Sequence, residues 1–299
     1  MNRGKRFAVA ALTVGAAGVA CWFGVPWARS RPAAWEAKVA EHAVSAAATP
    51  EAAPPAGTSE LDTARQLLAD GKKYEARTLL TKLILAAPEG PGRESLRRML
   101  DTINKDLFFS NKTPSPDCLS YTVADDDQLS AIARKQGKDL YFSEVIMLVN
   151  GISDARRLRA RTVLKIPQGQ FSAIVQKHAH RLIILLNDHY IKEYDVALGA
   201  PATPTPEGPL VMDISKAKNP TWTAPDGKVY KYGDPNNILG TRWMAFKDTA
   251  QHQGLGIHGT SDPASVGKDV SNGCVRLANH DVEEIFGMLA PGDTVDIRK

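Results

Sequence analysis

The C-terminal part of the chain consists of short apolar runs separated by turn residues, a pattern that few folds can accommodate. Val, Ile, Leu and Tyr alternate or cluster over residues 172–176, 181–187 and 190–197. Runs this short, bounded by polar turn residues, predict strands rather than helices. Further strands are expected at 243–247, 254–258, 274–277 and 293–298. The sequence therefore predicts a β-rich domain over residues 171–299.

A single helix is expected near the end of this domain. Asn279 is a candidate N-cap, and the acidic residues Asp281 and Glu283 follow in what would be the first turn. Pro291 and Gly292 provide a stop signal. Together these signals predict a helix over residues 280–289.

The same domain carries two residues that could perform acyl transfer. His258 stands sixteen positions before Cys274, and each adjoins a glycine. A cysteine attacks as the thiolate, so a catalytic cysteine needs a nearby base or a lowered pKa, and a histidine on an adjacent strand would supply the base. The N–H groups of Gly273 and Cys274 could approach a reacting carbonyl and form an oxyanion hole.

The letters around this pair resemble the catalytic motif of the L,D-transpeptidases, which carry a YkuD-type domain. The matching segments are His258-Gly259-Thr260, Pro263 to Gly267 and Ser271-Asn272-Gly273-Cys274-Val275-Arg276, preceded by Leu198-Gly199, Thr205 to Gly208, and Asn236 to Gly240 before Arg242-Trp243. The resemblance runs over about residues 171–298. Many members have His where this chain has Asn272.

The resemblance implies a peptidoglycan acyltransferase that acts in cell-wall synthesis and thereby in cell shape. Cys274 would be the nucleophile, His258 the base, the Gly259 carbonyl the group that orients His258, and Gly273 an oxyanion donor. The thioester formed with one tetrapeptide stem would pass to an amine of a second stem, giving a 3→3 cross-link, and no cofactor is implied. Two alternatives stay open: an L,D-carboxypeptidase in which water resolves the acyl-enzyme, and a non-catalytic wall-binding protein.

Candidate substrate-binding residues surround this pair. Arg276 would share a strand face with Cys274, and there it could hold a substrate carboxylate or brace the loop. Ser271 and Asn272 favour loop-ordering hydrogen bonds. The remaining candidates for the groove, which could equally be core or turn residues, are Trp243, Asn237 and Tyr230.

Two competing interpretations of the reactive residues are disfavoured. A zinc site built from His252, His258 and His280 would lack the closely spaced ligand pair that such sites usually have. Cys118 lies in a stretch rich in Pro and Ser, and we interpret it as a bystander.

Residues 120–168 resemble a LysM module, whose members bind the glycan strands of peptidoglycan. The matching letters are Tyr121-Thr122-Val123, Asp127 to Ala133, Val149 to Ile152 and Leu164 to Pro167. The implied α+β order is strand, helix, helix, strand. The chain departs from the pattern at residues 124–126 and at Arg161, where Gly is common. We expect the module to be separable, so that its deletion would spare turnover of small soluble stem peptides.

Residues 59–110 have helical periodicity, broken at Asp70-Gly71 and again at residues 88–91. The pattern predicts about three helices, of which the first two resemble a tetratricopeptide-type hairpin. One hairpin is too short for a repeat array, which favours a helical spacer over a partner-binding repeat.

The N-terminus predicts attachment to the cytoplasmic membrane. Residues 1–31 contain a basic start and an uncharged stretch from Phe7 to Ala28, long enough for a signal-anchor helix. The lipoprotein interpretation of Cys21 is weak, and the Ala/Pro-rich residues 32–58 predict a linker. A cell-wall enzyme would then lie outside the cytoplasm. The formal net charge is only +4 and no basic run is interleaved with aromatics, so we expect no nucleic-acid partner.

Overall fold

The computed structural model describes residues 59–299. The predicted anchor (1–31) and linker (32–58), including Cys21, lie outside these residues. Among residues 59–299, no helix is both long and apolar enough to cross a membrane.

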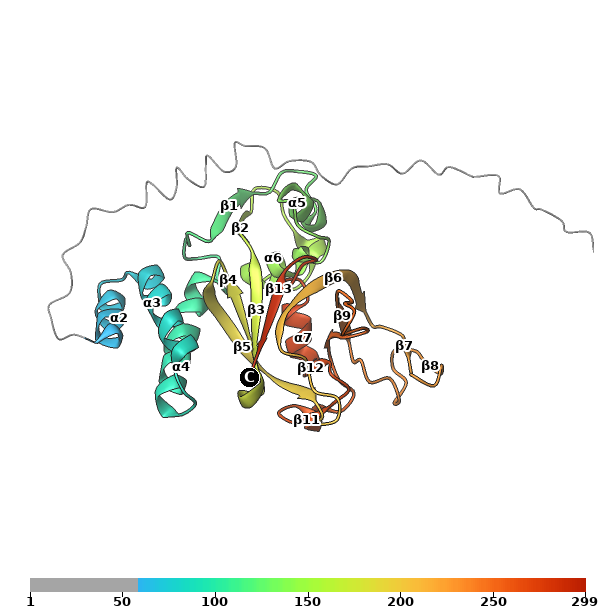
Figure 1. Ribbon diagram of the computed structural model, residues 1–299. Helices are drawn as coiled ribbons and strands as arrows, with labels where there is room; N and C mark the ends of the chain where they lie inside the picture. Colours follow the sequence, from blue (N-terminus) through green and yellow to red (C-terminus); the bar gives the residue numbers. More distant parts are fainter. Residues whose placement is uncertain (1–58) are drawn as a thin grey trace, which may run out of the picture. The chain divides into compact units, whose positions relative to one another are not determined.

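Six helices and thirteen strands are found in the described part of the chain (Figure 1). The helices are α2 (Glu60–Ala69), α3 (Lys73–Ala86), α4 (Pro91–Leu107), α5 (Leu129–Lys135), α6 (Phe142–Asn150) and α7 (Asn279–Ile285). The strands are β1 (Cys118–Thr122), β2 (Val163–Pro167), β3 (Phe171–Gln176), β4 (Arg181–Leu186), β5 (His189–Gly199), β6 (Gly208–Lys218), β7 (Trp222–Thr223), β8 (Val229–Tyr230), β9 (Arg242–Phe246), β10 (Gly256–His258), β11 (Asp269–Ser271), β12 (Val275–Leu277) and β13 (Thr294–Arg298).

The C-terminal domain is built on one nine-stranded sheet in the order β11-β5-β12-β10-β9-β6-β13-β3-β4. The sheet closes on itself because β5 also pairs with β4. The long strand β5 makes this possible by pairing with β4 over its first part and with β12 and β11 over its last residues. The seven predicted strands are confirmed, whereas β6, β7, β8 and β11 were not predicted.

Helix α7 packs its apolar side into the same core as the strands. Val282, Ile285 and Phe286 are fully buried in the hydrophobic cluster of the sheet. The predicted helix is therefore present, but it begins at Asn279 and ends earlier than expected. Ala278, not Asn279, occupies the N-cap position, and this leaves the Asn279 side chain free for another role.

Helices α3 and α4 pack against β5 of the sheet, and α2 packs against α3, while the spacer role expected of these helices stays a prediction. Buried residues of α3 and α4, such as Leu80 and Leu100, share a hydrophobic cluster with Ile183 and Tyr190 of the sheet. The contact also buries charge. Arg93 donates two hydrogen bonds to the Glu193 carboxylate, at 3.0 and 2.7 Å, and both side chains are at most 7% exposed.

Residues 118–167 contain the predicted strand–helix–helix–strand order, and β1 pairs antiparallel with β2. This ββ pair with α5 and α6, hereafter the βααβ unit, shares its core with the C-terminal domain. Tyr141 makes an edge-to-face contact with Phe286 at 4.6 Å between ring centroids. A side chain on Gly287 would meet the Tyr141 carbonyl at 2.5 Å. Deletion of the unit would expose this shared core, which argues against separability, and the expectation that deletion spares turnover stays a prediction.

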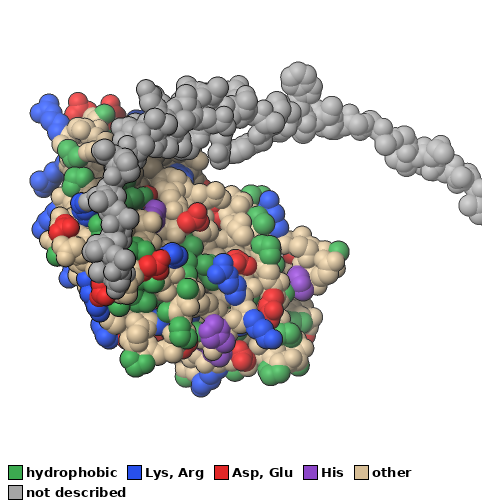
Figure 2. Space-filling model, turned by 60° about the vertical axis from the view of Figure 1, so that its left-hand side comes forward, with side chains coloured by type: hydrophobic (Ala, Val, Ile, Leu, Met, Phe, Trp, Pro, Cys, Tyr) green, Lys and Arg blue, Asp and Glu red, His purple; other side chains and the backbone are tan. Residues whose placement is uncertain are grey.

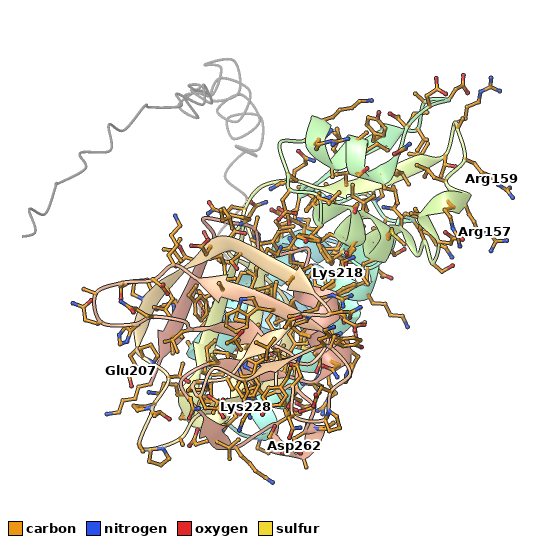
Figure 3. The ribbon with its side chains drawn as sticks, turned by 90° about the vertical axis from the view of Figure 1, so that its right-hand side faces the viewer. Arg157, Arg159, Glu207, Lys218, Lys228 and Asp262 are labelled. Carbon is orange, nitrogen blue, oxygen red and sulfur yellow. The ribbon has the colours of Figure 1, made fainter. Side chains whose placement is uncertain are left out.

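Charged residues of both signs are interspersed over the surface shown in Figure 2. One loop of the βααβ unit differs from this pattern. It carries four exposed arginines within six positions, at 156, 157, 159 and 161, and Arg157 and Arg159 project outward in Figure 3. This concentration of charge was not predicted.

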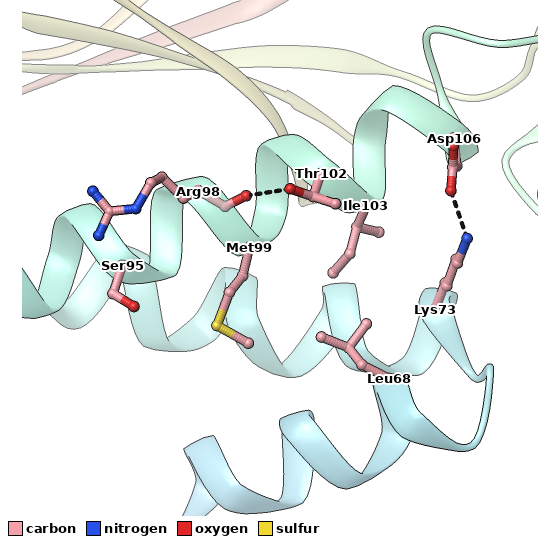
Figure 4. A pocket seen from close by; sticks show the side chains of 8 residues that line it. All are labelled: Leu68, Lys73, Ser95, Arg98, Met99, Thr102, Ile103 and Asp106. Carbon is pink, nitrogen blue, oxygen red and sulfur yellow. Dashed lines mark hydrogen bonds and ion pairs between the residues drawn. The ribbon is translucent and has the colours of Figure 1, made fainter.

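The helices α2, α3 and α4 leave an open groove of about 450 Å³ between them (Figure 4). Leu68, Met99 and Ile103 line it with apolar surface, and Lys73 pairs with Asp106 at 2.5 Å on its rim. The groove contains no cysteine or histidine, so the chemistry of the chain must be sought elsewhere.

Candidate active site

Strand register brings the two predicted reactive residues to one face of the sheet. Strand β10 lies between β9 and β12, and His258 pairs with Trp243 on one side and with Arg276 on the other. Alternate residues of a strand share a face, so Cys274, two positions before Arg276, lies on the same face as His258. The opposite face carries the fully buried residues Met244, Ile257 and Val275. The alternation thus separates the core from the site.

His258 is buried and held by its own neighbour. Its Nδ1 lies 2.6 Å from the carbonyl oxygen of Gly259. A carbonyl only accepts, so Nδ1 carries the hydrogen and Nε2 keeps a free lone pair. Burial lowers the pKa of His258 to about 4, and the positive charge of Arg276 acts in the same direction. The imidazole is therefore neutral near pH 7 and able to accept a proton.

Cys274 is a protonated thiol in this environment. Burial raises its pKa, although the Gly256 backbone N–H and the charge of Arg276 both oppose the rise. The thiol lies 4.0 Å from the Gly254 carbonyl oxygen. Of the two alternatives for activation, the raised pKa of Cys274 argues against a lowered pKa, and the nearby base stays a prediction.

Trp243 forms one wall beside these residues. Its ring centroid is 5.8 Å from that of His258. A side chain on Gly256 would come within 2.8 Å of the indole, so the ring occupies the space that this glycine leaves open. Trp243 therefore lies beside His258, and its assignment to a substrate groove stays a prediction.

Ser271 braces the turn that carries the thiol. Its buried hydroxyl donates to the Cys274 carbonyl at 2.7 Å and accepts from the Gly273 N–H at 3.2 Å. It is thus not placed to contact substrate. The bond also changes the expectation for Gly273, whose N–H is already engaged and would have to be shared to stabilise an oxyanion. Gly273 has φ of 100°, which disfavours any residue with a side chain there.

Arg276 is the least satisfied polar group of the site. Its Nε is buried without a hydrogen-bond partner, and its guanidinium makes no hydrogen bond or ion pair to other residues of 59–299. Bracing of the loop, one of its two predicted roles, is therefore not observed. Partial burial lowers the pKa of Arg276, and the nearby Cys274 and Asp262 oppose this shift.

The other predicted groove residues have different roles. Asn237 is buried and donates to the carbonyls of Pro220 and Tyr230, at 2.9 and 3.1 Å, while it accepts from Leu239 N–H. It joins two loops, which is the turn role that the sequence left open, and its assignment to the groove stays a prediction. Tyr230 stacks on Trp222 with ring centroids 5.5 Å apart, and Asn272 is exposed.

Asn279 is a residue of the site that sequence reasoning missed. Its Oδ1 accepts from the backbone N–H groups of Thr241 and Thr260, at 3.2 and 3.1 Å, close to His258 in the sheet. The only signal in the sequence was its N-cap potential, which pointed to a local role.

Other titratable residues offer no rival site. Within residues 59–299 no three His, Cys, Asp or Glu side chains are grouped so as to hold a metal ion. Cys118 and Cys274 are both free thiols. Burial raises the pKa of Cys118 to about 11.

The C-terminal domain is similar to known proteins. Residues 170–297 match the model of the YkuD L,D-transpeptidase catalytic domain. Putative L,D-transpeptidase YqjB of Bacillus subtilis is 39% identical over 124 residues, which cover 41% of this chain and 68% of that protein. Putative L,D-transpeptidase YkuD of the same organism is 32% identical over 187 residues, which cover 60% of this chain and 99% of YkuD.

A solved structure with a bound adduct is also similar. L,D-transpeptidase 3 from Mycobacterium tuberculosis, in complex with a faropenem-derived adduct, is 17% identical with a TM-score of 0.35. The match covers 46% of this chain and 65% of that one. A TM-score below 0.5 does not by itself establish a shared fold, so the assignment rests on the sequence relatives.

Proposed function

Because the chain belongs to the L,D-transpeptidase family with a YkuD-type catalytic domain, we propose that it cross-links peptidoglycan stems through a thioester on Cys274. The observation that carries this proposal is the arrangement of a neutral imidazole, with Nε2 free, on the same sheet face as a protonated thiol.

The first half-reaction forms the acyl-enzyme. His258 Nε2 takes the proton of the Cys274 thiol as Sγ attacks the carbonyl carbon of the third residue of a tetrapeptide stem. The tetrahedral intermediate collapses, the peptide bond to the terminal D-alanine breaks, and the imidazolium gives its proton to the departing amine. The product is a thioester and free D-alanine, with His258 neutral again.

The second half-reaction reverses the proton path. The side-chain amine of a second stem attacks the thioester carbonyl, and His258 accepts a proton from it. The C–S bond breaks, the thiolate recovers the proton, and a 3→3 amide cross-link is formed. Water in place of the amine would give a carboxypeptidase, so the identity of the released product distinguishes the two reactions.

Arg276 is proposed to hold a substrate carboxylate. The guanidinium shares the sheet face of Cys274 and has no partner among the described residues. A buried donor without a partner is costly, and a carboxylate can satisfy it with two hydrogen bonds. The Cys274 N–H, with a shared Gly273 N–H, would face the oxyanion.

The remaining parts of the chain are assigned by the same proposal. The alignment with YkuD covers 60% of the 299 residues of this chain. That is more than the 130 residues of 170–299 can hold, so the similarity extends into the βααβ unit. We assign that unit as a LysM-type module that binds glycan strands. An enzyme with these substrates acts outside the cytoplasm, where the N-terminal segment would anchor it.

Faropenem tests the acyl-enzyme directly. Intact-mass analysis of residues 59–299 with faropenem should show one covalent adduct, mapped by peptide digestion to Cys274. An adduct on Cys118, or none, would contradict the assignment. Incubation with tetrapeptide-containing peptidoglycan should then release D-alanine and give 3→3 dimers. Tripeptides without dimers would identify the hydrolytic reaction instead.

A further inference from the structure

We propose that Asn279, the first residue of α7, is a positioning residue that fixes the Gly259–Thr260 peptide group and through it the imidazole of His258. The inference rests on the proposed function only for the role of His258 as the base. The contacts that carry it are independent of any substrate.

The two ends of a single peptide group connect Asn279 with His258. The carbonyl of the Gly259–Thr260 peptide accepts from His258 Nδ1 at 2.6 Å. The N–H of the same peptide donates to Asn279 Oδ1 at 3.1 Å. A peptide group is planar, so an acceptor that fixes the direction of the N–H also fixes the direction of the carbonyl. Asn279 therefore sets the orientation of the acceptor that holds His258.

Asn279 also closes the end of the β9–β10 ladder. The last backbone hydrogen bond there runs from Gly259 N–H to the Arg242 carbonyl at 3.1 Å. Beyond it the two strands separate, and Oδ1 accepts from Thr241 N–H as well as from Thr260 N–H. Both neighbours are donors, so the carbonyl oxygen and not the amide nitrogen of Asn279 must face them.

Two glycines make room for this oxygen. A side chain on Gly240 or on Gly259 would occupy the position of Asn279 Oδ1, closer than any real carbon contact. Gly240 also has φ of 63°, which favours glycine. The Asn-Ile-Leu-Gly and His-Gly-Thr segments are thus shaped around one side chain of α7.

The test combines histidine NMR with acylation kinetics. Wild-type protein labelled with ¹⁵N should show His258 as a single Nδ1–H tautomer, identified by the signals that His258→Ala removes. Asn279→Ala leaves two donors unpaired and frees the peptide, so we expect mixed tautomers and faropenem acylation about 10- to 100-fold slower. Asn279→Asp keeps the acceptor and should keep the tautomer, while its charge raises the pKa of His258.

Asn104→Ala is the matched control. Asn104 likewise makes two side-chain hydrogen bonds to the backbone, but as a donor, to the carbonyls of Tyr190 and Ile191 in the helix–sheet contact. The Asn104→Ala substitution should lower the melting temperature without changing the His258 tautomer.

A purely structural Asn279 would give a different result. The proposal is overturned if Asn279→Ala loses stability as Asn104→Ala does but keeps the single tautomer and the wild-type acylation rate. Should Asn279→Ala fail to fold, an unchanged pKa of His258 in Asn279→Asp would overturn it equally. If wild type is not acylated, the proposed function fails, and the NMR result still decides the role of Asn279.

Discussion

Two regions of this molecule bury polar side chains, and they treat them in opposite ways. In the contact between α4 and the sheet, the Arg93 guanidinium is matched to Glu193 by two hydrogen bonds. On the face of β10 and β12, His258 and Cys274 are both neutral, and Arg276 has no partner in residues 59–299. Buried polar groups are normally satisfied within the protein. The Nε of both arginines lacks a hydrogen-bond partner, so the two regions differ at the terminal nitrogens, which Arg93 uses to bind Glu193. We propose that the guanidinium without a partner marks the face that a substrate completes.

The largest effect expected from this contrast is that of Cys274→Ala. Removal of the thiol should abolish adduct formation with faropenem, because the other described thiol, Cys118, has a pKa raised to about 11. Intact-mass spectrometry checks this. Cys118→Ala is the matched control and should acylate like wild type. If Cys118→Ala lost the adduct and Cys274→Ala kept it, Cys118 would be the nucleophile.

His258→Ala should slow acylation by about 10²- to 10⁴-fold, the usual contribution of a general base. The protonated thiol then has no acceptor for its proton. Stopped-flow acylation kinetics measure the loss. Asn272→Ala changes an exposed side chain of the same loop and should cost much less. If both variants lost the same acylation rate, Asn272 would have to be counted among the catalytic residues.

Arg93→Ala should act on stability rather than on chemistry. It leaves the buried Glu193 carboxylate with fewer partners, which is expected to cost about 3–5 kcal/mol. Urea unfolding followed by circular dichroism measures the change. Residual folded protein should still form the Cys274 adduct at a normal rate, and a selective loss of acylation would contradict the separation of the two regions.

Arg276→Gln should affect substrate binding rather than stability. Loss of a substrate-carboxylate contact is expected to lower kcat/KM by about 10- to 100-fold, mainly through KM, since a charge-assisted hydrogen bond contributes about 1.5–3 kcal/mol. Stability should be kept or raised, because a half-buried charge without a partner is removed. Kinetics with a stem peptide and urea unfolding test both halves. A destabilised variant with normal KM would restore the bracing role.

The pH dependence should be shallow across the neutral range. His258 titrates at about 4 in the fold and near 6.5 when unfolded. Its contribution to stability is therefore complete above pH 6.5 and is lost as the pH falls toward 4. Acylation should likewise fall only near pH 4, and an acid limb at pH 6 to 7 would show that His258 is less buried than described.

The sequence predicted the strands whose side chains are nearly all apolar, such as β3 and β4. It missed β6, which contains Pro209, Ser215 and Lys216, because the neighbouring strands β9 and β13 rather than its own composition make it a strand. The reactive pair was predictable from its motif. The loop-ordering role expected of Ser271 is found, whereas residue type alone did not decide between a turn role and a groove role for Asn237.

The role of Asn279 could not be predicted from the sequence because its partners are distant along the chain. Its N-cap signal concerns the residues that follow it, whereas its partners Thr260 and Thr241 lie 19 and 38 positions earlier. Only the folded sheet brings them together. The core that the βααβ unit shares with α7 could not be predicted either. The residues that resemble LysM indicate the structure of the module and not the elements that pack against it.

The acceptor that orients His258 is the Gly259 carbonyl, a group of the main chain. In many hydrolases the corresponding acceptor is a side chain, which a single codon change can remove. Every amino acid carries the same carbonyl, so no missense mutation deletes this one. Loss-of-function variants, and resistance variants that evade a covalent inhibitor, should accordingly cluster at Cys274, at His258 and at the small residues that shape the bend, rather than at a third acidic position.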